Sequence, residues 1–193
     1  DVPIEIHIVS ILWIMKIGYL LEKDFDEKCF GNRLIFEKKR ANSNSQKVVE
    51  GEGLFKPYYN QYQKWRDEGI TVAKQYLDKK QSVLFINIDI KDYYYSVRFT
   101  FESLRQALLK HDSHYLMKDF SMLVEVFEQT HLKYTELIKK TGYPNDLIKN
   151  VSKNESILPI GLASSYILAN WYLQKFDSRV HQHIRPIYYS RYV

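Results

Sequence analysis

Cysteine is almost absent from this chain, because Cys29 is the only one among 193 residues. A single thiol excludes an internal disulfide and leaves no cysteine pair to hold a metal, so we expect a reducing compartment, the cytoplasm. Long apolar runs are missing too. The strongest one, from Ile11 to Leu21, is interrupted by Lys16 and Gly18 and is too short to cross a bilayer. It predicts neither a membrane anchor nor a signal peptide, and no membrane partner is expected.

The excess of positive charge is small, a formal +5, so the composition allows a polyanionic partner without requiring one. The cations are unevenly distributed, in a cluster at Lys38, Lys39 and Arg40 and in a group of lysines between Lys133 and Lys153. Each cluster is either a solvated face or a surface for a polyanion. With 45% apolar and 15% aromatic residues, the chain has ample material for a core and should fold as one or two domains.

The stretch from Val83 to Ser96 has the clearest chemical pattern in the chain. An apolar run predicts a buried strand over 83–89, which ends at Asp89, and Asp92 and three tyrosines follow before the chain turns toward a helix. A carboxylate at the end of a strand is a typical position for a metal ligand. The alternative is structural, since many α/β proteins end a core strand on an aspartate.

Apolar spacing predicts helices over 4–24, 55–79, 101–110 and 120–140, with Gly69 as a point where the second one bends or breaks. The aromatic residues of the second helix form either part of the core or a platform on which nucleic-acid bases stack. Between the first two helices, the polar stretch from Ala41 to Gly53 predicts a loop. That loop is either an ordinary surface loop or one that closes over a ligand.

A second motif, Leu158 to Ser165, leads into a strongly apolar helix over 166–173. Pro159 and Gly161 fix a tight loop, which either offers backbone N–H groups to a nucleotide or simply caps the helix. The alternation from Arg185 to Val193 then predicts a terminal strand.

Taken in order, these three pieces resemble the palm motifs of reverse transcriptases. DIKDYYYSV is similar to the first motif, LPIGLASSYILAN to the second, and the terminal RYV to the opening of the third. Within that family the chain is most similar to bacterial enzymes of the abortive-infection or phage-defence, retron and group II intron types. The resemblance implies an α+β fold, with right-hand polymerase fingers and a partial palm whose sheet is backed by helices, truncated before the thumb.

The resemblance also divides the chain. It implies a fingers-like region at 1–82, a first part of the palm at 83–110, a helical insertion at 111–157, and a second part of the palm at 158–193. The chain begins at Asp1 without a methionine and stops inside the third motif, so we expect it to be part of a longer protein.

The resemblance implies a role for each matching residue. Asp89 would bind both catalytic Mg²⁺ ions, with Mn²⁺ as an alternative, and the carbonyl of Ile90 would help to hold one of them. The amides of Asp92 and Tyr93 would approach the triphosphate, and Tyr94 would exclude a 2′-hydroxyl. The remaining candidates are Gly161 and Ser164 below the incoming base and template and, by residue type alone, Lys38, Lys39 and Arg40 at the triphosphate.

Three departures from the family pattern are visible. The two adjacent aspartates of the third motif would follow Val193 and are not in this chain. Ile160 stands where many retroviral relatives have glutamine, which removes a polar contact near the nucleotide. The fingers-like region also lacks the proline-lysine-glycine-arginine signature of intron and retron enzymes.

The resemblance implies that the intact parent adds deoxynucleotides to a 3′-hydroxyl by a two-metal mechanism, in phage defence or in a retroelement. Its partners would be dNTPs and nucleic acid, as RNA template, DNA product or both. The 193-residue fragment, with one of three carboxylates, should be inactive alone. Two other hypotheses remain: a degenerate polymerase fold that binds nucleic acid or protein, and an unrelated α/β domain that matches the motifs by chance.

Overall fold

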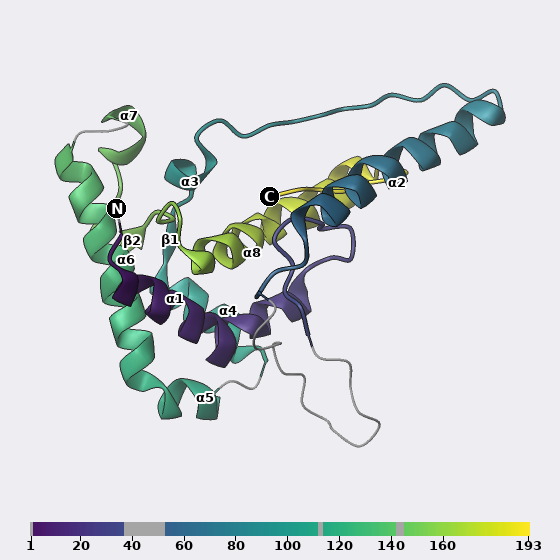
Figure 1. Cartoon of the computed structure of the whole chain (residues 1–193). Coiled ribbons are helices and arrows are strands. Elements are labelled where there is room, and N and C mark those ends of the chain that lie inside the picture. The colour runs from purple at the N-terminus through teal and green to yellow at the C-terminus, as the bar shows by residue number, and fades with distance from the viewer. Residues whose placement is uncertain (1, 37–52, 112–113, 142–144) are drawn as a thin grey trace, which may run out of the picture. The chain divides into compact units, whose positions relative to one another are not determined.

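The structure, a computed structural model, describes residues 2–36, 53–111, 114–141 and 145–193. The fold is α+β and mostly helical, with one small antiparallel sheet among the described residues (Figure 1). The chain divides into two units, each formed from two separate stretches. Unit 1 comprises Asp1–Asp24 and Lys91–Tyr172, and unit 2 comprises Phe25–Ile90 and Leu173–Val193.

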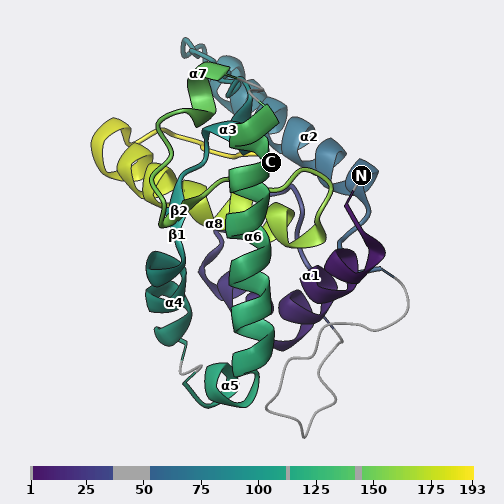
Figure 2. The same ribbon diagram turned by 90° about the vertical axis from the view of Figure 1, so that its left-hand side faces the viewer.

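Unit 1 contains most of the helices. Its elements are α1 (Ile4–Lys16), a 3-10 helix (Gly18–Asp24), α3 (Tyr93–Ser96), β1 (Phe99–Thr100), α4 (Phe101–Leu109), α5 (His114–Asp119), α6 (Ser121–Thr141), α7 (Asn145–Ile148), β2 (Glu155–Ser156) and the first part of α8 (Ala163–Arg179). Figure 2 shows α6 as the long central helix of this unit, with α4 and α1 on its two sides.

The core of unit 1 is built on an aromatic contact between α1 and α6. Trp13 stacks on Phe127 with ring centroids 4.1 Å apart and planes 3° from parallel. Both side chains are almost fully buried. A Cβ at Gly18 would lie 2.3 Å from the Trp13 ring, so only glycine lets the chain turn this close to the tryptophan. Because the contact joins residues far apart in sequence, it fixes how the first helix packs.

The sheet of unit 1 joins the two regions in which the sequence motifs lie. β1 pairs with β2 antiparallel, with Phe99 opposite Ser156. Behind it, the Thr135 hydroxyl lies 3.1 Å from the Ser156 hydroxyl and accepts a hydrogen bond from the backbone N–H of Ile157 at 3.2 Å. These buried polar groups satisfy one another, so the strands stay in register beside α6.

Unit 2 contains α2 (Tyr58–Asp78), the end of α8 and a π-helical turn (Val180–Ile184). Isolated bridges join Cys29 to Arg191 and Leu34 to Phe55. Within α2, which is 21 residues long, only Gln61 and Ala73 are buried. A helix with so little buried surface gains little stability from packing within its own unit.

The predicted helices are confirmed. The first prediction corresponds to α1 followed by the 3-10 helix, and the others correspond to α2, α4 and α6. Gly69 does not interrupt α2. The loop predicted from Ala41 to Gly53 lies, except for Gly53, outside the described residues.

The strand predicted over 83–89 is wrong. Residues 81–90 have no regular secondary structure, and Figure 1 draws them as an extended trace without an arrow. Leu84, Phe85 and Ile86 are 83%, 64% and 72% exposed. From 82 to 90 no backbone group makes a hydrogen bond to any residue that the structure describes. A strand is held by its neighbours in a sheet, and no described segment lies alongside this one.

The terminal strand predicted from Arg185 to Val193 is also wrong. In this stretch only Arg191 pairs with another backbone, through its parallel bridge to Cys29. Alternating side chains are therefore not enough to form a strand here, since a full ladder needs an adjacent segment of matching length.

No single helix in the described ranges is both long and apolar enough to span a membrane. The bent pair formed by α1 and the following 3-10 helix meets that test only when the two are taken together, across a 51° bend.

Candidate functional site

Asp89 and Ile90 lie at the end of the extended segment, in unit 2. The Asp89 side chain is exposed, and Ile90 is 43% exposed. A carboxylate in this setting is fully available to a cation, but the segment itself does not hold it in a fixed direction. The described residues therefore provide an accessible carboxylate and not a preformed site.

The chain turns sharply after Lys91, at the start of unit 1. Asp92 has a left-handed backbone with φ of 52° and stands just before the short helix α3. Its carbonyl accepts hydrogen bonds from the backbone N–H groups of Tyr95 and Ser96, both at 3.0 Å. Aspartate tolerates this conformation better than most residues, so its place at the turn has a local explanation in the sequence.

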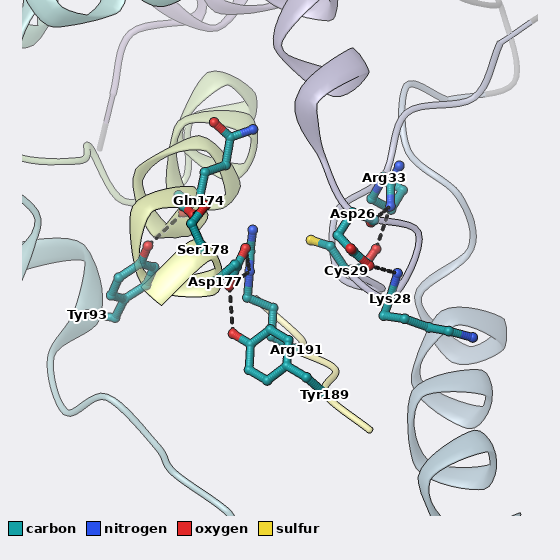
Figure 3. Close-up of polar contacts among 11 residues, drawn as sticks. Asp26, Lys28, Cys29, Arg33, Tyr93, Gln174, Asp177, Ser178, Tyr189 and Arg191 are labelled. Carbon is teal, nitrogen blue, oxygen red and sulfur yellow. Dashed lines mark hydrogen bonds and ion pairs between the residues drawn. The ribbon is translucent and has the colours of Figure 1, made fainter. Parts of the chain in front are cut away.

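Tyr93 connects the first motif to the helix of the second motif. Its hydroxyl donates a hydrogen bond of 2.7 Å to the carbonyl of Ala169 in α8. Figure 3 shows the Tyr93 side chain pointing toward α8, with a dashed line from its hydroxyl. The two residues are both in unit 1. The side chain of Tyr93 is thus committed to holding α3 against α8, which is a positioning role.

Tyr94 occupies a half-buried position between two other tyrosines. Its ring lies edge-on to Tyr93 at 6.0 Å and to Tyr166 at 6.5 Å between centroids. Burial raises the pKa of the Tyr94 hydroxyl well above its usual value, so this group stays protonated at neutral pH. The carbonyl of Tyr94 accepts a 3.2 Å hydrogen bond from the backbone N–H of Leu158. The first and second motifs are therefore in direct contact.

The loop of the second motif has a well-defined internal structure. Gly161 has φ of 90° and is exposed, and a Cβ there would meet no atom within 4 Å, so backbone conformation is what favours glycine. The Ser165 hydroxyl donates to the Pro159 carbonyl at 2.5 Å, which closes the loop onto the start of α8. The Ile160 side chain is 50% exposed beside Gly161.

Ser164 points into the interior of unit 1. It is completely buried, and its backbone N–H donates a 2.8 Å hydrogen bond to the hydroxyl of Ser10 in α1. Its own hydroxyl has no hydrogen-bond partner among the described residues. In this position the serine joins α8 to α1, and it is not accessible to a ligand in the form that the structure describes.

Lys38, Lys39 and Arg40, the candidates for the triphosphate, lie outside the described residues. Among the residues that are described, no group of three or more His, Cys, Asp or Glu side chains is placed to hold a metal ion. Asp89 alone does not fit a site for two Mg²⁺ ions, which need several carboxylate oxygens.

A buried ion pair that no sequence pattern indicated holds Arg191, in the terminal RYV, against α8. The guanidinium of Arg191 donates from Nε to both oxygens of Asp177 in α8, at 3.0 and 2.9 Å, and the Tyr189 hydroxyl donates to the same carboxylate at 2.6 Å (Figure 3). Arg191 and Asp177 are each 8% exposed. Asp177 lies within α8 and Arg191 lies beyond the end of that helix and the turn that follows it, so no single periodic element contains both residues and no local pattern reveals the pair.

Arg191 is held through its backbone as well. Its N–H donates to the Lys28 carbonyl at 3.1 Å, and its carbonyl accepts from the N–H of Phe30 at 3.0 Å. The beginning of the third motif thus has a fixed place within unit 2, set by one side-chain pair and one backbone bridge.

Comparisons of the chain with models of protein families, with curated proteins and with solved structures gave no match. The class that the fold itself defines is α+β, and any function has to be argued from the residues described above.

Proposed function

We propose that this chain is the fingers and half of the palm of a bacterial reverse transcriptase, whose intact parent adds deoxynucleotides to a 3′-hydroxyl in phage defence or in a retroelement. In this proposal Asp89 is one of three carboxylates that bind Mg²⁺. The other two are the adjacent aspartates that the third motif would supply after Val193. When bound, the two ions stabilise the attacking and leaving oxygens of the phosphoryl transfer.

The observation that carries the proposal is the contact between the first and second motifs. The 3.2 Å hydrogen bond from Leu158 to Tyr94 and the 2.7 Å bond from Tyr93 to Ala169 join two stretches that are distant in sequence. A polymerase site needs such contact, since one motif presents the metal ligand and the sugar-sensing ring while the other shapes the surface below the base. Chance similarity of two separate motifs gives no reason for them to meet.

The test uses the intact parent with a primer–template, labelled dNTPs and Mg²⁺. Asp89→Asn should reduce incorporation at least about 1,000-fold, because losing a metal-ligand charge removes several kcal/mol of transition-state stabilisation. The matched control is Asp78→Asn, which changes an exposed aspartate at the end of α2 in the same unit. It should leave incorporation unchanged.

Near-normal synthesis by the Asp89→Asn parent would mean that this aspartate is structural and would refute the site assignment. A wild-type parent that binds nucleic acid but incorporates no dNTP would instead favour the degenerate, non-catalytic module. The coding sequence after Val193 separates the two cases at once, since only the catalytic form needs the two further aspartates.

A further inference from the structure

The N-terminal end of α2 presents tyrosine rings to solvent. Tyr58 and Tyr59 are 68% and 65% exposed, and Tyr62 is 37% exposed. Tyr58 and Tyr62, one helical turn apart, lie with their rings 14° from parallel and 6.1 Å between centroids. Ring faces that are open, nearly parallel and next to one another form a surface on which flat aromatic groups can stack.

The ring of Tyr192 packs against the rings of Tyr58 and Tyr62. It contacts Tyr58 and Tyr62 edge-on, each at 5.7 Å, and Trp65 at 5.9 Å. Burial raises the pKa of the Tyr192 hydroxyl to about 12. We call Tyr58, Tyr59, Tyr62, Trp65 and Tyr192, all in unit 2, the aromatic platform. Since the rings of Tyr58, Tyr62, Trp65 and Tyr192 contact one another, these side chains have little conformational entropy left to lose on binding.

The surroundings of the aromatic platform are positive and rich in amides. No acidic residue occurs from Phe55 to Arg66, a stretch that contains Lys56, Lys64 and Arg66. Beside it, an open groove of about 700 Å³ is lined by residues that include Lys28, Lys56, Asn60, Gln63 and Lys64.

The two described carboxylates that line the groove, Asp67 and Glu68, each form an ion pair. Glu68 pairs with Lys28 at 2.5 Å, and Asp67 pairs with Arg66 at 2.7 Å. Lys64, which is exposed and makes no ion pair with a described residue, gives this end of α2 a positive charge that suits a phosphate.

We infer that the aromatic platform and its groove bind single-stranded nucleic acid, with bases stacked on Tyr58 and Tyr62 and a phosphate beside Lys64. The amides of Asn60 and Gln63 offer both donors and acceptors to base edges. Stacking on open rings tolerates any base, so binding should depend little on sequence. The inference rests on the proposed function, which it deepens by assigning a surface to the template or product strand.

The test measures fluorescence anisotropy of 5′-fluorescein-labelled (dT)₁₂ and (rU)₁₂ with the 193-residue chain, in the absence of metal and dNTP. Tyr58→Ala and Tyr62→Ala should each weaken binding at least about 5-fold, the lower limit for one lost stacking contact. Tyr62→Phe should bind like the wild type, because it keeps the ring. The control is Tyr76→Ala, which removes a tyrosine of the same helix about 20 Å from Tyr62.

The lysines are tested through the salt dependence. Lys64→Ala should reduce the slope of log K against log salt by about 0.7, which corresponds to one phosphate contact with a single strand. Lys74→Ala removes an exposed lysine further along the same helix and should leave the slope unchanged.

Equal affinity of the wild type, Tyr58→Ala and Tyr62→Ala would overturn the inference, as would an equal loss in Tyr76→Ala. A second result would also overturn it. In that case the wild-type chain binds neither oligonucleotide and forms a dimer, detected by sedimentation, and Tyr58→Ala abolishes the dimer. This outcome is separate from the catalytic test. The Asp89→Asn parent should lose synthesis and keep its oligonucleotide affinity, whereas a parent that keeps synthesis with Asp89→Asn would refute the catalytic site and leave the platform standing.

Discussion

His131 lies at the centre of the unit 1 core, and we predict that it makes the stability of this unit depend on pH. The side chain is fully buried against the rings of Phe127, Phe101 and Phe99, at 4.2, 5.8 and 6.4 Å between centroids. Its Nδ1 lies 2.9 Å from the Phe127 carbonyl, which only an N–H can satisfy, and Nε2 has no partner among the described residues. A proton on Nε2 would be buried without an acceptor.

Burial lowers the pKa of His131 to about 4 from its ordinary 6.5, against a smaller effect of the Phe127 carbonyl. The unfolded chain therefore binds more protons than the folded one between these two values. The contribution to stability is complete above about pH 6.5 and is lost as the pH falls toward 4. At pH 5 the free energy of unfolding is lower by about 2 kcal/mol, because pH 5 lies about 1.5 pH units below the unfolded pKa and each pH unit contributes about 1.4 kcal/mol.

The assay is urea unfolding at pH 7.5 and pH 5.0, followed by tryptophan emission. Trp13 stacks on Phe127 and Trp171 lies edge-on to Phe99, so both report on this core. His131→Leu should remove about 2 kcal/mol of the difference between the two pH values, whatever its effect at pH 7.5. The control His7→Leu changes a partly exposed histidine of α1 and should keep the wild-type difference. An unchanged difference in His131→Leu would refute the argument.

Three further predictions concern other contacts. Asp177→Ala should lower the free energy of unfolding by about 3–5 kcal/mol in urea, because it leaves Arg191 buried without its carboxylate, and the double variant with Arg191→Met should recover most of this loss. Gly31→Ala should cost about 1–3 kcal/mol by the same measurement, since its Cβ would lie 2.1 Å from the Val193 carbonyl oxygen, whereas Gly69→Ala inside α2 meets nothing closer than 3.5 Å and should stabilise by about 0.5–1 kcal/mol. In the intact parent, Tyr94→Ala should increase the ratio of ribonucleotide to deoxynucleotide incorporation and Tyr94→Phe should not; equal ratios would place the sugar-sensing group elsewhere.

The pairing of the two sequence motifs illustrates how much of the site could be predicted. From the sequence, the resemblance indicated Tyr93, Tyr94 and the loop at Gly161 as candidates, and it explained the residue type at Tyr94 and Gly161 only. It did not indicate that the Tyr93 hydroxyl donates a hydrogen bond to the Ala169 carbonyl, or that Ser164 is buried with its backbone N–H bonded to the Ser10 hydroxyl. These contacts join residues 76 and 154 positions apart, and no local period carries such information.

The sequence by itself determined where the long helices lie, because the apolar spacing that predicts them acts within a few residues. Only the tertiary structure decided the state of the apolar run from Val83 to Ile90. Its composition predicts a strand, yet a strand exists only where another backbone accepts its hydrogen bonds, and no described segment does so. The same reason explains Arg191, whose place in the fold is set by Asp177, Lys28 and Phe30 and not by its neighbours in sequence.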